Sequence, residues 1–170
     1  MQTWKIKMNP KEFKGWWEKL GCSSLFFDGA SKGNPGMEGA GGVYFNCEGS
    51  KLKEYAWGIN RKTNNGVERL ALIKGMDLAR NDGIEELVVF GDSCMVIREA
   101  RKITRNRKNT VNKTHHLLKF MVNEFKAINF LHVLREKNKQ ADSMSNKGVD
   151  LDCDSLLCNQ QVYERNWVTL

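Results

Sequence analysis

Five short apolar runs, bounded by glycine or polar residues, mark the predicted strands of this chain. They cover residues 25–28, 42–45, 52–58, 87–90 and 128–134. Apolar residues at helical spacing predict helices over residues 65–81, 110–127 and 138–146, with a shorter one just after Ser93. Thr63 or Asn64 is the expected cap of the first long helix.

The order of these elements predicts an α/β fold. A three-stranded meander followed by alternating helices and strands is typical of a mixed sheet flanked by helices. The domain that contains the sheet is expected to cover residues 22–148, and residues 149–170 form a C-terminal extension with no readable motif. Residues 1–21 are expected to be an N-terminal leader whose short amphipathic helix, bearing Trp16 and Trp17, packs on the domain edge.

Four acidic residues stand at informative places in this pattern. Asp28 ends the first apolar run and opens the sequence Asp-Gly-Ala-Ser-Lys-Gly-Asn-Pro-Gly, and Asp92 ends the fourth run. Glu68 follows Thr-Asn-Asn-Gly-Val at the start of a helix, and Asp142 ends Arg-Glu-Lys-Asn-Lys-Gln-Ala-Asp. Each acid alone has a simpler explanation, as a turn residue, a helix cap, a first-turn helix acid or a surface charge. However, a carboxylate beside buried strands is costly unless its charge is offset, so two strands that each end in Asp indicate a shared metal.

These four motifs, in this order, resemble the ribonuclease H family, type 1. The resemblance covers about residues 24–148, and the Arg-Glu-x-Asn-x-x-Ala-Asp motif looks like the archaeal and plant branch, including domains of plant retroelements. It implies a five-stranded mixed sheet in the order 3-2-1-4-5, with the first three strands antiparallel and the last two parallel. Asp28 and Asp92 would then emerge side by side, and a right-handed crossover would bring Glu68 to the same place.

The resemblance also implies catalytic and metal-binding roles for Asp28, Glu68, Asp92 and Asp142. They would hold two Mg²⁺ ions, with Mn²⁺ as a substitute. Asp28 would bridge both ions, Asp92 and Glu68 would share the ion on the leaving-group side, and Asp142 would hold the ion beside the nucleophile. Mg²⁺ prefers hard carboxylate oxygens, so this donor set suits it better than cysteine or histidine.

A second set of residues is implied to bind the substrate. In the family, the glycine-rich loop and the paired asparagines contact the 2′-hydroxyls of the RNA strand and the sugar edge across the minor groove, which distinguishes RNA from DNA. The corresponding residues here are Ser31, Gly33, Asn34, Asn64 and Asn65. Arg61 and Thr63, together with Asn34, match a pocket for a phosphate of the DNA strand. Capping of the helix is a simpler role for the two asparagines, and it is compatible with binding.

Two departures from the family pattern affect the expected turnover. Many members carry a histidine-bearing loop between the fifth strand and the last helix, whereas Arg135 runs on to Asn138 here without one. Arg135 would substitute for it electrostatically, and His132 is interpreted as a structural residue of the strand. Cys94 follows Ser93 at a position where many members place a glutamine facing the RNA, so one RNA contact is expected to be lost.

The positive charge of the chain is concentrated in one segment. The net charge is +7, from 27 lysines and arginines against 20 acids. Residues 98–119 contain a single acid, Glu99, and eight basic residues, namely Arg98, Arg101, Lys102, Arg105, Arg107, Lys108, Lys113 and Lys119. This local cluster is typical of a phosphate-binding surface, with a solvated helix and loop as the alternative.

Composition limits the remaining possibilities. A chain of 170 residues, 41% hydrophobic and 28% charged, fits one domain with a sizeable core. An odd number of scattered cysteines argues against a disulfide framework, and the spacing of Cys153, Cys158 and His132 matches no common zinc motif. Because no secretory signal and no membrane-spanning stretch are evident, we expect an intracellular protein with no membrane partner.

The sequence therefore predicts an endonuclease that hydrolyses the RNA strand of RNA–DNA hybrids and leaves a 3′-hydroxyl and a 5′-phosphate. The hybrid is its expected partner, and a reverse transcriptase or other polyprotein segments are further candidates. Two alternatives remain: a catalytically weak or inactive nucleic-acid-binding module of a larger, retroelement-type protein, and a structural domain whose basic surface binds an acidic partner.

Overall fold

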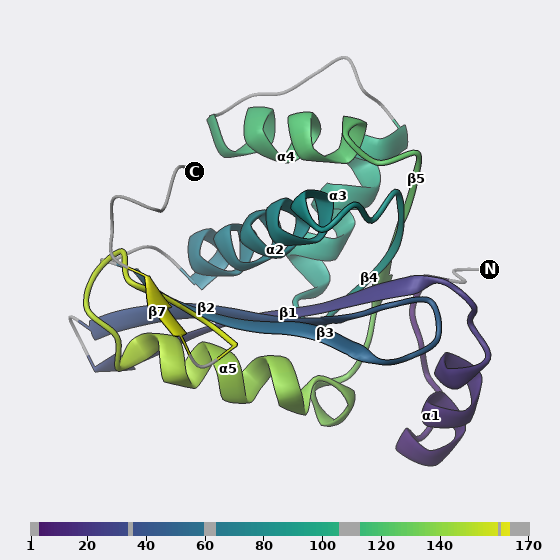
Figure 1. Cartoon of the computed structure of the whole chain (residues 1–170), viewed down its shortest axis with the longest axis horizontal. Coiled ribbons are helices and arrows are strands. Elements are labelled where there is room, and N and C mark those ends of the chain that lie inside the picture. Colours follow the sequence, from purple (N-terminus) through teal and green to yellow (C-terminus); the bar gives the residue numbers. More distant parts are fainter. Residues whose placement is uncertain (1–3, 34–35, 60–63, 106–112, 160, 164–170) are drawn as a thin grey trace.

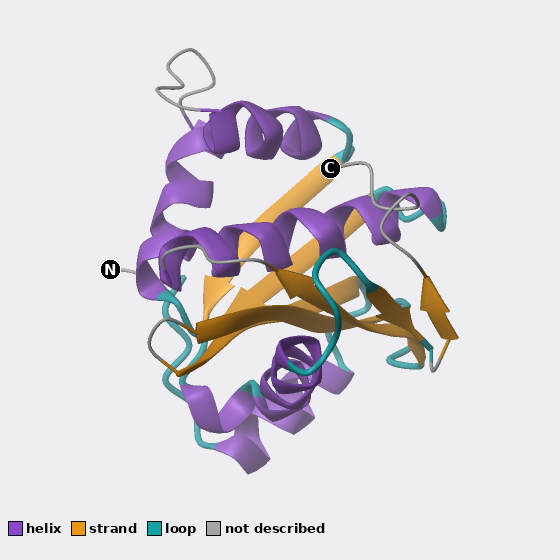
Figure 2. Ribbon diagram, turned by 90° about the vertical axis from the view of Figure 1, so that its left-hand side faces the viewer, coloured by secondary structure: helices purple, strands orange, loops and turns teal. Residues whose placement is uncertain are grey.

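One mixed sheet organises the chain, and helices cover both of its faces (Figures 1 and 2). The computed structural model describes residues 4–33, 36–59, 64–105, 113–159 and 161–163; at residues 64–65, 113–115 and 161–163 it describes the backbone alone. Within the described residues, no helix is both long and apolar enough to cross a membrane.

The described part of the sheet has seven strands, so the prediction of a five-stranded sheet was wrong. The strands are β1 (Ser23–Gly33), β2 (Gly36–Phe45), β3 (Lys51–Ile59), β4 (Glu86–Gly91), β5 (Ala127–His132), β6 (Leu156–Cys158) and β7 (Gln161–Tyr163), in the order β5-β4-β1-β2-β3-β6-β7. The predicted order 3-2-1-4-5 is present, from β3 to β5 at one edge of the sheet, with β1, β4 and β5 parallel and the other pairs antiparallel. The two further strands come from the C-terminal extension, where Leu156 pairs with Trp57 and covers the edge of β3.

The helices lie on both sides of this sheet. They are α1 (Pro10–Glu18), α2 (Asn64–Asn81), α3 (Cys94–Arg105), α4 (Lys113–Asn123) and α5 (Lys139–Val149), with a 3-10 turn, η1 (Arg135–Lys137), before the last. α2, α3 and α4 lie on one face, and α1 and α5 on the other (Figure 1). α4 ends earlier than the predicted residue 127 because Lys126 donates its backbone N–H to Glu85 at 2.8 Å, which turns the chain into β5.

β1 is also longer than predicted. The sequence suggested a loop immediately after Asp28, but β1 continues to Gly33, which pairs with Gly36 at the start of β2. Because β2 supplies backbone partners along this length, residues 28–33 form strand rather than loop, and Asp28 lies within a strand.

Alternating side chains of β1 divide the core into two layers, as the two-residue period of a strand requires. Leu25 and Phe27 are buried on the α2 side, in a cluster that includes Leu72 and Met76. Phe26 points to the opposite face, into a second buried cluster with residues of β2, β4 and the N-terminal segment.

The N-terminal segment packs into this second cluster. Asn9 caps α1 by accepting a hydrogen bond from the backbone of Glu12 at 2.9 Å, and the helix buries Phe13. The Phe13 ring meets Phe26 and Phe90 edge to face, at centroid distances of 6.2 and 5.4 Å. The leader expected at the domain edge therefore contributes buried aromatic area to the core, while the division of the chain at residues 21–22 and 148–149 stays a prediction.

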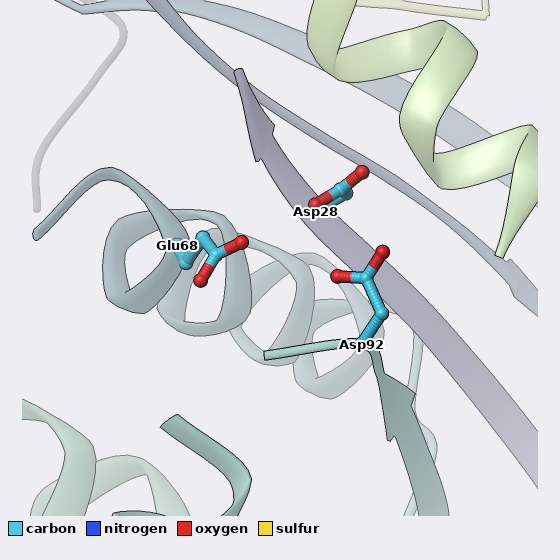
Figure 3. Close-up of side chains that lie close together, drawn as sticks. All are labelled: Asp28, Glu68 and Asp92. Atoms are coloured by element: carbon cyan, nitrogen blue, oxygen red, sulfur yellow. The ribbon is translucent and has the colours of Figure 1, made fainter. Parts of the chain in front are cut away.

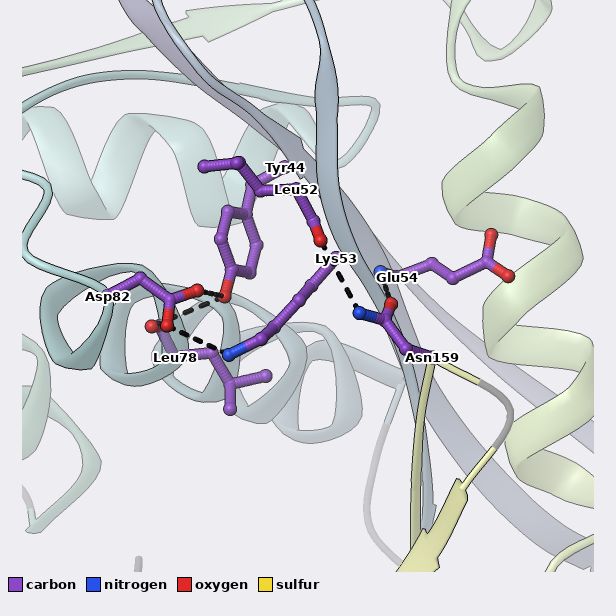
Figure 4. Close-up of polar contacts among 7 residues, drawn as sticks. All are labelled: Tyr44, Leu52, Lys53, Glu54, Leu78, Asp82 and Asn159. Carbon is purple, nitrogen blue, oxygen red and sulfur yellow. Dashed lines mark hydrogen bonds and ion pairs between the residues drawn. The ribbon is translucent and has the colours of Figure 1, made fainter.

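Polar contacts fasten the end of α2 and the C-terminal strands to the sheet (Figure 4). The Tyr44 hydroxyl donates to the Asp82 carboxylate, which also accepts from the Lys53 ammonium at 2.8 Å. Asn159 accepts from the backbone N–H of Glu54 at 2.9 Å, which holds the segment after β6 beside β3.

Candidate active site

Adjacent parallel strands bring two of the four predicted acids together. The register of β1 and β4 places Phe27 opposite Gly91, so the residues that follow, Asp28 and Asp92, are neighbours across the sheet. Asp28 is only 4% exposed, and its Oδ1 accepts a hydrogen bond from the Gly29 backbone at 2.9 Å. The predicted proximity of these two acids is present because β4 inserts beside β1 in the parallel direction.

Glu68 reaches the same place from the N-terminal part of α2. The three carboxylates of Asp28, Glu68 and Asp92 converge, so that one oxygen of each lies within 4.8 Å of one oxygen of the other two. We call these three residues the acidic cluster (Figure 3). The absence of a side chain at Gly29 permits this approach, since a Cβ there would lie 2.8 Å from the Glu68 Cγ. Glycine after Asp28 therefore has a steric reason in addition to its place in the motif.

The acids of this cluster resist ionisation. Burial is the main cause that raises the pKa of Asp28 to about 8, and the charge of Asp92 is the next. Burial also raises the pKa of Glu68 and of Asp92 above their ordinary values, while the positive charge of Arg135 opposes the rise at both residues. It is costly to ionise all three carboxylates at once, and a bound cation would reduce that cost. The three carboxylates therefore form a suitable set of donors for a cation. The cluster can therefore bind a divalent metal.

Asp142 lies near the acidic cluster but is not one of the three grouped acids. It lines a cavity of about 270 Å³ together with Gly29, Ser31 and Glu68, and its negative charge contributes to the raised pKa of Asp28. Its carboxylate is 3.7 Å from the guanidinium of Arg135, which lines the same cavity and is 83% exposed. Glu68 of α2 and Asp142 of α5 thus line one polar cavity, and Asp28 and Asp92 lie beside Glu68 in the acidic cluster.

Glycines in β2 determine how closely α5, which carries Asp142, approaches the sheet. A Cβ on Gly39 would lie 2.2 Å from the backbone nitrogen of Val149, and one on Gly41 would lie 2.3 Å from that of Ser145. Distances this short exclude any side chain. The glycine-rich sequence of β2 is therefore a packing requirement for α5, which the sequence analysis had not identified.

Two further residues support the cluster. The amide of Asn138 is 1% exposed and donates to the Phe27 carbonyl at 2.9 Å, just before Asp28. A hydrogen bond from the same side chain lowers the pKa of Asp92. His132 places its Nε2 3.2 Å from the Asp92 carbonyl, consistent with the structural role predicted for it. Asn138 was missed, although its place in the Arg-Glu-x-Asn-x-x-Ala-Asp motif was an available signal.

The predicted substrate-binding residues are only partly described. Ser31 is exposed in β1 and lines the polar cavity, and Gly33 ends the same strand. Asn64 and Asn65 begin α2, with backbone alone described. Asn34, Arg61 and Thr63 lie outside the described residues. Their roles in binding stay predictions.

The described basic residues of the 98–119 segment belong mainly to α3. Arg98, Lys102 and Arg105 are exposed on that helix. Arg101 differs, since its guanidinium donates to the Phe130 carbonyl at 3.1 Å and lies 5.4 Å from the centre of the Trp4 ring. Arg101 is thus engaged in packing, and the three exposed residues are available to a partner.

The fold and the acidic cluster together define a ribonuclease H-like α/β protein with a candidate divalent-metal site. Over residues 26–148 the chain matches the model of the family described as "Reverse transcriptase-like". It is 30% identical over 133 residues to the ribonuclease HI of Halobacterium salinarum, covering 78% of this chain and 67% of that protein. The crystal structure of LC11-RNase H1 in complex with an RNA/DNA hybrid superposes with a TM-score of 0.64 at 27% identity, covering 75% of this chain and 96% of that one.

These similarities are sufficient to assign the family: the chain belongs to the ribonuclease H family, type 1. A bifunctional protein of Mycobacterium tuberculosis is 33% identical over 129 residues, and this chain spans 35% of its length. The ribonuclease H fold therefore occurs in relatives both as most of a protein and as a part of a longer one.

Proposed function

We propose that this chain is an endonuclease that hydrolyses the RNA strand of RNA–DNA hybrids and leaves a 3′-hydroxyl and a 5′-phosphate. The observation that carries the proposal is the convergence of the carboxylates of Asp28, Glu68 and Asp92 within 4.8 Å at adjoining elements of a ribonuclease H-like sheet. The relatives support it by name: one is called ribonuclease HI, and the structure of another contains an RNA/DNA hybrid.

The residues present fit divalent ions, and Mg²⁺ is the proposed cofactor, with Mn²⁺ as a substitute. The donors are hard carboxylate oxygens, and burial is the main cause that raises the pKa of all three clustered acids. A bound cation would offset the cost of ionising them in this buried place. Bound ions of this type lower the pKa of an attacking water and stabilise the leaving oxygen of a phosphodiester. Two such ions would be held by Asp28, Glu68, Asp92 and Asp142: Asp28 would contribute to both, Glu68 and Asp92 to the ion that serves the leaving oxygen, and Asp142 to the ion that serves the attacking water.

Protein groups around the cluster would orient these ligands. Asn138 holds the Phe27 carbonyl and bonds the side chain of Asp92, which limits the movement of both strand ends. Arg135 is 3.7 Å from Asp142 and offsets negative charge on the outer side of the cavity. Arg135 therefore provides a positive charge where other family members carry a histidine-bearing loop.

Substrate contacts are proposed for residues on either side of the polar cavity. Ser31, Gly33 and Asn34 would contact the RNA strand along with Asn64 and Asn65. Arg61 and Thr63 would bind a phosphate of the DNA strand. The exposed basic residues of α3 would add affinity that is independent of sequence and weakens as salt is raised. We also propose that the chain can function beside a reverse transcriptase within a larger protein.

The test is cleavage of a hybrid labelled on its RNA strand, in Mg²⁺, in Mn²⁺ and in chelator, with duplex DNA and duplex RNA as competitors. Asp92→Asn keeps the size of the side chain and the His132 contact to the backbone carbonyl, so it removes only a metal-binding charge. The exposed Asp152→Asn is the matched control. We expect metal-dependent cutting of RNA only in the hybrid, lost in Asp92→Asn and retained in the control.

Two other outcomes would contradict the proposal. Binding of the hybrid without cutting under any metal would identify a non-catalytic nucleic-acid-binding module. Failure to bind the hybrid at all would point to the structural alternative, in which the basic surface serves another acidic partner.

A further inference from the structure

A second cavity lies on the opposite face of the sheet from α2, between α1 and the start of α5. Its volume is about 230 Å³, and we call it the Lys137 cavity. Four aromatic side chains form its apolar walls: Phe13, Trp17, Phe26 and Phe45. Trp17 and Phe45 meet edge to face at 4.8 Å, and the Trp17 Nε1 is bound to the Ser24 hydroxyl at 2.8 Å. The acidic cluster does not line this cavity, which is therefore a separate site.

The cavity is bordered by a buried positive charge. The Lys137 side chain is 1% exposed, and its Nζ has no hydrogen-bond partner in the described part of the chain. The nearest charge is the Glu136 carboxylate at 3.6 Å, which is beyond hydrogen-bond distance and belongs to a half-exposed side chain. An ammonium group has three donors, and burying them without acceptors is costly. A ligand oxygen beside Lys137 would remove that cost.

The charge around the cavity selects an anion. Lys14 and Lys139 line it in addition to Lys137, whereas Glu136 is the single acid among the described residues that line it, which leaves an excess of two positive charges there. Aromatic walls favour a flat apolar body that can pack against ring faces and edges. One end of the preferred ligand should therefore be a carboxylate and the other an aromatic ring.

The volume limits the size of that ligand. A cavity of 230 Å³ equals roughly eight water molecules of liquid. It is smaller than the roughly 300–1,000 Å³ of pockets that hold drug-sized molecules. A single ring with one carboxylate fits this space, whereas a folded partner or a nucleotide does not.

We propose that the Lys137 cavity binds a small aromatic monocarboxylate, with the carboxylate on the Lys137 ammonium and the ring between Phe13, Trp17 and Phe45. The site is independent of the proposed nuclease activity, so its test requires neither nucleic acid nor metal. The Trp17 indole N–H, which is hydrogen-bonded and borders the cavity, is a direct reporter.

Benzoate is titrated into the whole chain while the Trp17 indole cross-peak is followed by NMR, with Trp17→Phe used to assign it. Benzyl alcohol and benzylamine, which have the same ring but no negative charge, are titrated in parallel. We expect a saturable shift with benzoate and at least a tenfold weaker Kd for both analogues. Lys137→Met, which keeps an apolar stem of similar length, should weaken benzoate binding at least tenfold, while the exposed Lys19→Met should not.

Lys137→Arg preserves the charge and should retain benzoate binding, so the role of the charge can be judged even if Lys137→Met does not fold. The proposal is overturned by the absence of a saturable benzoate shift in the unmodified chain. Equal affinity for benzoate and benzyl alcohol, or an unchanged Kd in a folded Lys137→Met variant, would overturn it as well.

Discussion

Replacing Asp28 by asparagine measures how much the free energy of unfolding is lowered by a buried, ionisable carboxylate in the acidic cluster. The pKa of Asp28 is about 8 in the folded protein, against an ordinary value of 3.8, chiefly because of burial and then because of the charge of Asp92. Between these two pH values the folded state retains a proton that the unfolded state has lost. The stability of the unmodified chain therefore falls as the pH rises from about 4 to 8 and levels off above 8.

The structure provides a magnitude for this effect. A gap of about 4 pH units at 1.36 kcal/mol each sets an upper limit of about 5 kcal/mol for the cost of ionising Asp28. Structural relaxation and water entry reduce that limit, so we expect Asp28→Asn to stabilise the metal-free protein by about 2–3 kcal/mol at pH 9. For a chain of this size this corresponds to an increase in Tm of roughly 5–10 °C. Asparagine can still accept the Gly29 hydrogen bond, so the local backbone is preserved.

The assay is chemical denaturation in chelator at pH 5, 7 and 9, with the exposed Asp152→Asn as the control. The stabilisation by Asp28→Asn should grow with pH, whereas the control should not reproduce this trend. Added Mg²⁺ should stabilise the unmodified chain more than the variant, because only the former retains the Asp28 carboxylate. If Asp28→Asn is no more stable than the unmodified chain at pH 9, or if its advantage is the same at pH 5, the electrostatic reasoning is wrong.

Three further substitutions test the packing around the site by chemical denaturation. Phe13→Ala removes a buried ring that contacts Phe26 and Phe90 and should cost about 3–5 kcal/mol, while the exposed Lys11→Ala should be nearly neutral. Gly41→Ala places a Cβ 2.3 Å from the Ser145 nitrogen, so it should displace α5, cost about 1–3 kcal/mol or more, and impair hybrid cleavage through Asp142. Its matched control is Gly15→Ala in α1, where no atom lies within 4 Å and a gain of roughly 0.5–1 kcal/mol is expected. Tyr44→Phe deletes the donor to Asp82, which keeps its contact with Lys53, and should cost about 1–2 kcal/mol; an unchanged stability would show that this hydrogen bond contributes nothing.

Local sequence was sufficient to predict the central strands, the main helices and the order of the four acids. The apolar run of Leu25, Phe26 and Phe27 and the helical spacing before Asn81 are local patterns, and each is present in the fold as a strand or a helix. The family resemblance supplied the parallel neighbours β1 and β4. It did not reveal β6 and β7, because these strands are three residues long and exist through pairing with β3 and with each other rather than through a pattern of their own.

The sequence by itself determined which acids are available to the candidate site, because all four occur in the chain at the ends of predicted strands or within predicted helices. Tertiary structure alone decided that Asp28, Glu68 and Asp92 form a close cluster while Asp142 stands across the cavity with Arg135. The physical reason is that side-chain distance depends on how closely elements pack, and that closeness rests on contacts distant in sequence. Gly29 admits Glu68, and Gly41 admits α5, so the absence of two side chains sets the dimensions of the site.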